Sequence, residues 1–240
     1  MIACLTFSAF LTSIISAVVG MAGGIVLLSI MTFFLPLNII IPIHGLVQLV
    51  SNTTRTWLLR IHVIKPVFLY FLIGLPFGGL TSVYFIKQVD SKVVPLSLIA
   101  GLIIYTLFKP KKLPALKIPF WAFVFIGFFV GVLGPLIGAT GPFMAPFFLR
   151  SDWEKENIVA TKASVQIMGH LIKIPVFLYI GFPYLDYTLT IFLMAAVSLI
   201  GTKVGIMILG KIEDKIFRWI YKIALFAALI RLVDKILSLL

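Results

Sequence analysis

Two apolar stretches of the chain each carry a line of polar and cationic side chains at helical spacing. The first line falls at positions i, i+4, i+8 and i+11, and its members are His44, Gln48, Asn52 and Arg55. The second line repeats the pattern with Lys162, Gln166, His170 and Lys173. Residues at this spacing share one face of a helix. Amide and imidazole groups donate hydrogen bonds and Lys and Arg are positively charged, so each face is suited to binding an oxyanion.

These polar faces also have a structural interpretation. Gln, Asn and His side chains hydrogen-bond between membrane helices, at about 0.6–2 kcal/mol each. Arg55 and Lys173 could instead extend from a helix end to the membrane interface. The histidines His44 and His170 are either titrating groups or hydrogen-bonded structural ones. A single polar residue fits the structural interpretation, whereas the duplicated pattern favours a ligand site.

A glycine-rich break precedes each polar face. The residues of these breaks that we assign to the site are Gly20, Gly23, Gly24, Gly138, Thr140 and Gly141. Glycine allows the backbone to approach a ligand closely, and a helix beginning there presents free N–H groups and a positive dipole end to an anion. The alternative is close helix packing through small residues. Lys203, which lies between Gly201 and Gly205, is a further secondary candidate that faces either the same cavity or the interface.

The composition places these residues in a membrane. The chain is 61% hydrophobic with a mean hydropathy of +1.17, which leaves too little polar surface for a water-soluble globule. The net charge of +12 arises from basic residues that lie mainly between apolar runs, a pattern that sets membrane orientation and does not indicate nucleic-acid binding. Cys4 is the only cysteine, so no disulfide within the chain and no cysteine-based metal site is expected.

The acidic residues are informative by their positions. All eight lie in loops or near the ends of apolar segments. A membrane interior without carboxylates argues against a cation transporter, a carboxylate proton relay and a membrane enzyme with paired aspartates. We therefore expect neither a metal, nor a cofactor, nor an enzymatic activity.

The chain divides into eight apolar segments and two halves. The segments are 2–36, 39–59, 66–86, 93–108, 118–149, 157–180, 187–210 and 216–238. The first and fifth are too long for one membrane span of about 20 residues and are interrupted by glycine, so each is expected to form two short helices. A basic linker, 109–117, separates an N-terminal repeat, 1–108, from a C-terminal repeat, 118–240.

The two halves are related by a constant offset. A shift of 118 residues places Gly20 on Gly138 and Gln48 on Gln166. If each long segment returns as a broken or re-entrant hairpin, each repeat adds three transmembrane helices and the repeats are inverted. With the linker in the cytoplasm, eleven loop cations then lie inside and four outside, whereas parallel repeats give eight and seven. The positive-inside rule favours the inverted arrangement, with both termini outside.

The glycine breaks carry a family resemblance. They read GMAGGIVLLS at 20–29 and GATGPFMAPFF at 138–148, and with the length and duplication of the chain they resemble the TauE/SafE family of sulfite exporter-like permeases, also called TSUP. The first break departs from the family pattern at Ala22 and lacks the usual proline, and the second has Pro142 where glycine is common. The resemblance implies transport of sulfur oxyanions or organosulfonates such as sulfite and sulfoacetate.

The resulting expectation is a multi-pass protein of the cell membrane. It is an all-α secondary transporter that moves a small anion across the lipid bilayer by alternating access, with coupling to H⁺ or Na⁺ as an option. Two alternatives stay open from the residues themselves. One is an anion channel with the same polar faces lining a continuous pore, and the other is a membrane enzyme or assembly subunit that transports nothing.

Overall fold

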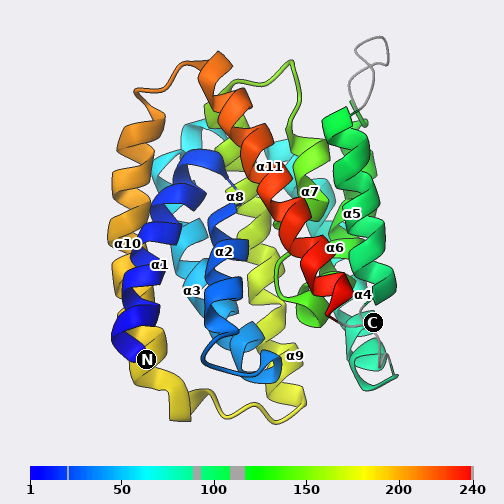
Figure 1. The fold of residues 1–240 in the computed structure, drawn as a ribbon. Helices are drawn as coiled ribbons and strands as arrows, with labels where there is room; N and C mark the ends of the chain where they lie inside the picture. Colours follow the sequence, from blue (N-terminus) through cyan, green and yellow to red (C-terminus); the bar gives the residue numbers. More distant parts are fainter. Residues whose placement is uncertain (21, 89–92, 109–116, 239–240) are drawn as a thin grey trace.

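The computed structural model describes the chain except for residues 21, 89–92, 109–116 and 239–240, so most of the linker lies outside the described residues. Throughout the described part the regular elements are helices that lie side by side (Figure 1). The α-helices are α1 (Ile2–Val19), α2 (Ala22–Met31), α3 (Leu37–Leu58), α4 (Lys65–Gln88), α5 (Val93–Phe108), α6 (Phe123–Ile137), α7 (Gly141–Phe148), α8 (Lys155–Leu171), α9 (Lys173–Tyr179), α10 (Thr188–Leu209) and α11 (Asp214–Leu237). The short 3₁₀ helices of the described residues are η1 (Arg60–His62), η2 (Phe120–Ala122) and η3 (Tyr184–Tyr187).

Four helical stretches of the described chain are long and apolar enough to cross a membrane: Ile2–Val19, Lys65–Phe85, Phe120–Ile137 and Tyr184–Leu209. Large apolar side chains such as Phe7, Leu80 and Leu189 are exposed on the outer surface of these helices. Such a surface is favourable against lipid and unfavourable in water. The expectation of an all-helical membrane protein is confirmed.

Both long apolar segments are broken at glycine, as expected. α1 ends at Gly20, whose φ is 81°, and α6 ends at Gly138, whose φ is 83°. The N–H groups of these glycines bond to the carbonyl oxygens of Ser16 and Gly134. A helix commonly ends at a residue with left-handed backbone conformation, which glycine adopts at no steric cost. The short helices α2 and α7 begin directly after these turns.

One segment that reads as continuous in the sequence, 157–180, is interrupted in the structure. α8 ends at Leu171 and α9 begins at Lys173, with Ile172 between them. Pro175 is the cause, because it has no N–H to donate to the carbonyl oxygen of Leu171 one turn earlier and its ring crowds that oxygen. The interruption places His170 and Lys173 at the junction of two helices.

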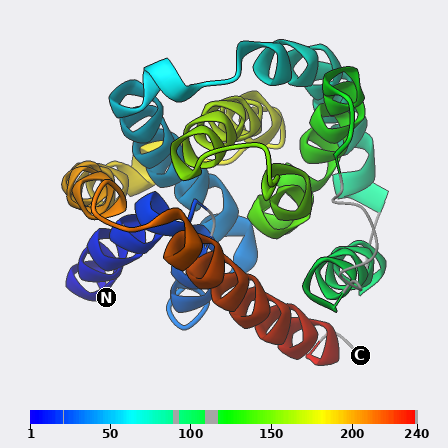
Figure 2. The same cartoon turned by 90° about the horizontal axis from the view of Figure 1, so that it is seen from above.

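α8 lies in the interior of the bundle, with α3, α4 and α6 packed around it (Figure 2). Its residues Ile158, Val159 and Val165 belong to the main hydrophobic core. Two further pairs of helices pack extensively against each other, α1 with α10 and α4 with α6. The polar face of α8 is therefore presented to neighbouring helices and not to lipid.

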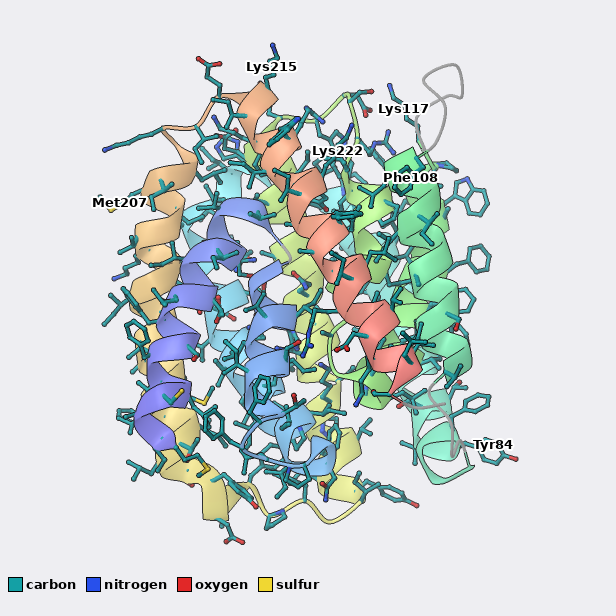
Figure 3. All side chains as sticks on the ribbon, viewed as in Figure 1. Tyr84, Phe108, Lys117, Met207, Lys215 and Lys222 are labelled. Atoms are coloured by element: carbon teal, nitrogen blue, oxygen red, sulfur yellow. The ribbon has the colours of Figure 1, made fainter. Side chains whose placement is uncertain are left out.

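Two of the basic residues that the sequence assigns to the cytoplasmic side of the membrane lie at one end of the bundle. Lys117 and Lys215 lie at this end and Tyr84 at the opposite one (Figure 3). Arg218 donates to the backbone oxygens of Arg150 and Trp153, which ties α11 to the loop before α8. In the same loop, hydrogen bonds from Arg150 lower the pKa of the Asp152 carboxyl below its usual value.

Candidate functional site

The two polar faces cross each other in the middle of the bundle. α3 packs against α8, and side chains from both helices line one small cavity together with residues of α1, of α2 and of the segment 139–141. The lining residues are Ser16, Gly24, Ile25, His44, Gln48, Ala139, Thr140, Gly141, Gln166 and His170. The free volume is about 10 Å³, which is room for about one water molecule.

Two polar atoms at this cavity have no partner among the described residues. His44 Nε2 lies 2.8 Å from the carbonyl oxygen of Gly24 and must donate to it, because a carbonyl only accepts. His44 Nδ1 and Gln48 Nε2 are buried and form no hydrogen bond. A buried donor without an acceptor costs about 1–3 kcal/mol. A bound acceptor that faces the Gln48 amide would remove that cost.

Lys173 connects the second glycine turn to the polar face of α8. Its ammonium donates to the carbonyl oxygen of Gly138 and lies 3.3 Å from His170 Nδ1. Because an ammonium has only donors, His170 Nδ1 accepts and the neutral ring carries its proton on Nε2. The His170 ring meets the His44 ring edge to face at 6.1 Å. One cation and two imidazoles are thus grouped beside the cavity.

The other ends of the two faces form a second cationic group. Arg55 donates to Asn52 Oδ1 at 3.1 Å and to Ser51 Oγ at 3.3 Å. Lys162 donates to the Tyr221 hydroxyl at 3.3 Å and is close enough to Arg55 for the two charges to interact. Asn52 also donates to the backbone oxygen of Gln48, so it lies behind the cavity and does not line it.

The cations of both groups are buried without a counter-ion. Arg55 and Lys162 are 0% exposed and Lys173 is 2% exposed. The salt bridges of the described residues belong to other cations, namely Lys117, Arg150, Lys155 and Arg231. The hydrogen-bond partners of the three buried cations are neutral groups, and burying a charge without an opposite charge is strongly unfavourable. This arrangement has the electrostatics of an anion site.

The five predicted glycines differ in what they contact. Gly24 and Gly141 line the cavity. Gly23 faces α1, where an added Cβ would lie 1.8 Å from the backbone oxygen of Thr12. Gly20 and Gly138 supply the left-handed turns. Only part of the glycine motif therefore touches the cavity, and the rest allows the short helices to be placed beside it.

Other residues differ from the sequence-based expectation. Lys203 is exposed and does not reach the cavity. Ser16 lines the cavity although it was not predicted to do so. Its signal was the series Ser8, Thr12 and Ser16, which are all buried and share one face of α1. Within the described residues no group of His, Cys, Asp or Glu could hold a metal ion.

Comparison with known proteins gives one result that covers almost the whole chain. The family described as "Sulfite exporter TauE/SafE" matches residues 5–232. No curated protein and no solved structure matches the chain. Because the match spans both glycine turns and both polar faces, the protein belongs to the sulfite exporter TauE/SafE family of membrane permeases.

Proposed function

We propose that this permease is a secondary transporter that carries a small sulfur oxyanion or organosulfonate across the membrane by alternating access. The observation that carries the proposal is the set of three buried cations, Arg55, Lys162 and Lys173, that have no carboxylate partner among the described residues. They belong to the same polar faces as Gln48 and Gln166, whose amides line the central cavity. A cation would be repelled from such a site. A tetrahedral or pyramidal oxyanion would satisfy donors from several directions at once.

The donors would be supplied by both halves of the chain. Gln48 and Gln166 face the cavity from α3 and α8, and the N-terminus of α7 adds Gly141 and the preceding Thr140. The N-terminus of a helix adds a partial positive charge. His44 offers a route to proton coupling, because its Nε2 is held by Gly24 and a proton taken up at the unpartnered Nδ1 would create a further donor beside the anion.

Anion binding requires the site to open. A free volume of about 10 Å³ admits about one water molecule, and a sulfite ion has four heavy atoms. The short helices α2 and α7 are suited to this movement because each is joined to a long helix through a glycine turn. Opening toward one side of the membrane and then the other would constitute alternating access.

Reciprocal packing of the two halves supports the inverted repeat. α1 of the first half packs on α10 of the second, and α6 of the second half packs on α4 of the first. Each short helix also packs on a helix of the other half, α2 on α11 and α7 on α5. The polar faces cross with opposite direction, since Lys173 interacts with His44 at one end and Arg55 with Lys162 at the other. We therefore propose two inverted repeats, 1–108 and 118–240.

Flux into proteoliposomes tests this function directly. Sulfite, sulfoacetate, sulfate and acetate are supplied in turn, with and without an imposed pH or Na⁺ gradient. The proposal expects saturable uptake of at least one sulfur anion and none of Na⁺ alone. Currents far above carrier turnover would identify a channel instead. A reconstituted protein that moves no anion in any condition would contradict transport and favour a non-transporting subunit.

Replacing either cavity glutamine should weaken anion binding without unfolding the protein. Losing one hydrogen bond to a charged acceptor costs about 1.5–3 kcal/mol, so Gln48→Ala and Gln166→Ala should each lower affinity by about 10- to 150-fold. The matched control is Thr54→Val on α3, because Thr54 Oγ1 bonds only to Val50 O of its own helix. Binding and melting temperature are measured on the same samples. A lower melting temperature with unchanged affinity would show that the amides serve only helix packing.

The topology is tested by accessibility of single cysteines in intact cells. With Cys4 replaced by Ser, a cysteine at Lys117 should react only after the membrane is permeabilised, because the inverted arrangement that the positive-inside rule favours places this end of the linker in the cytoplasm. A cysteine at Ser238 should react from outside. Labelling of both positions from the cytoplasm would contradict the inverted repeat.

A further inference from the structure

A second, larger cavity adjoins the central one. It has a volume of about 320 Å³ and lies among α2, α3, α7 and α11. Ile25 and Ala139 line both cavities. Ile25 follows Gly24 in the chain, and Ala139 lies between Gly138 and Thr140. The large cavity therefore reaches the wall of the central site, and that wall is built by α2 and by the turn that precedes α7.

The walls of this cavity differ in chemistry. Leu28, Ile41 and Leu232 make much of it apolar, whereas the last part of α11 contributes Arg231 and Lys235. The same part of α11 contributes Asp234, so two cations and one carboxylate leave a net charge of +1. The cavity thus combines an apolar surface with a positively charged rim.

Arg231 also connects two helices. Its Nη1 donates to Asp234 Oδ2 at 2.8 Å within α11, and its Nε donates to Ser29 Oγ of α2 at 3.2 Å. α2 is the short helix that begins at the first glycine turn and carries Gly24. An anion that took over the donors of Arg231 would free Ser29, and with it the end of α2.

We propose that this cavity is the vestibule through which the transported anion enters, and that it binds an organic anion carrying a short apolar group next to its charge. The charged end would lie at Arg231 and Lys235, and the apolar end would lie against Leu28 and Ile41. This inference rests on the proposed transport function and names the substrate class for it. A bare inorganic ion would gain nothing from the apolar wall, because leaving water for such a surface is unfavourable.

The last turns of α11 line the vestibule, and α11 ends away from the end of the bundle at which Lys215 lies (Figures 1 and 3). Under the proposed topology the end where α11 terminates is on the outer side of the membrane. Displacement of Ile25 and Ala139 by movement of α2 and α7 would then join the vestibule to the central cavity. Entry of the anion and opening of the central cavity are coupled in this arrangement, because the Arg231 guanidinium that attracts the anion also holds α2 through Ser29.

Thiol labelling tests the vestibule without requiring transport. The background is Cys4→Ser, which removes the only cysteine. Leu28→Cys places a thiol in the vestibule, and Val26→Cys on the same helix is the control because Val26 is exposed on the outer surface and does not line the cavity. Both are treated from outside with membrane-impermeant methanethiosulfonate reagents, one ending in a sulfonate and one in a quaternary ammonium. Thr32→Cys, also in the lining, replaces Leu28→Cys if the latter is poorly folded.

The charge of the rim is varied in the same background. Arg231→Gln lowers the net charge to zero and Asp234→Asn raises it to +2. We expect the sulfonate reagent to label Leu28→Cys faster than Val26→Cys. The rate of labelling of Leu28→Cys should fall about threefold or more when Arg231→Gln is added, and it should rise when Asp234→Asn is added. The ammonium reagent should change in the opposite direction. Raising the ionic strength should reduce all of these differences.

Two results would overturn the inference. One is a vestibule thiol that reacts no faster than the control, as expected if a lipid chain fills the cavity. The other is a labelling rate that does not respond to the charges of Arg231 and Asp234. In a protein that transports, modification of Leu28→Cys should also block uptake, and competition should favour organosulfonates with a longer apolar group over sulfite. Absence of uptake by the wild-type protein would instead remove the proposed function while the labelling result stands.

Discussion

Lys173→Met should bind anions about 30- to 5,000-fold more weakly than the wild-type protein while melting at the same or a higher temperature. In the proposed site the bound anion forms a buried charge pair with the Lys173 ammonium, and removing one member of such a pair costs about 2–5 kcal/mol. The stability expectation has the opposite sign. Without an anion the Lys173 ammonium is buried beside the neutral Gly138 oxygen and His170, so its removal relieves an uncompensated charge.

Lys203→Met is the matched control for this variant. Lys203 is also a lysine of an apolar helix, but it is exposed, whereas Lys173 is buried beside His170, which lines the cavity. Its replacement should leave affinity and melting temperature unchanged. Calorimetric binding and thermal unfolding in detergent measure both quantities on one sample. If Lys173→Met kept its affinity and melted at a lower temperature, the lysine would be a structural tether of the Gly138 turn and not part of an anion site.

Gly23→Ala should destabilise the protein by more than about 3 kcal/mol, whereas Gly24→Ala should leave it folded. At Gly23 an added Cβ would lie 1.8 Å from Thr12 O and 2.8 Å from Ser16 N, so the backbones of α1 and α2 must separate. At Gly24 the nearest atoms belong to the Gln48 side chain at 3.5 Å, which is ordinary contact. Both positions lie in the first turns of α2, so the higher helix propensity of alanine affects the two variants alike.

The yield of monodisperse protein and its melting temperature measure this difference. Gly24→Ala should in addition weaken anion binding, because its methyl group is directed at the amide of Gln48 in the central cavity. The pair thus separates packing from ligand contact at two adjacent glycines. Equal melting temperatures for the two variants would contradict the close contact between α1 and α2.

Several features of this protein follow from the sequence alone. The spacing of Gln48 with His44, and of Gln166 with His170, places these side chains on single helix faces whatever the tertiary structure is. The glycines at 20 and 138 end helices because other residues rarely adopt a positive φ. The restriction of carboxylates to loops and segment ends leaves the buried cations without a partner in any helical arrangement. The helical membrane class was therefore predictable, and the same positions motivate the proposal of an anionic ligand.

The tertiary structure decided which of these residues face the central cavity. Gly23 and Gly24 are equivalent in the sequence motif, but the crossing of α1 and α2 turns one toward Thr12 and the other toward the cavity. Asn52 and His170 occupy matching positions, yet Asn52 bonds to Arg55 and the backbone while His170 lines the cavity. The partners of Lys162 and the vestibule at Arg231 come from α11, far away in the chain. Periodicity fixes a residue's direction around its own helix axis, but only the packing of distant helices determines what lies in that direction.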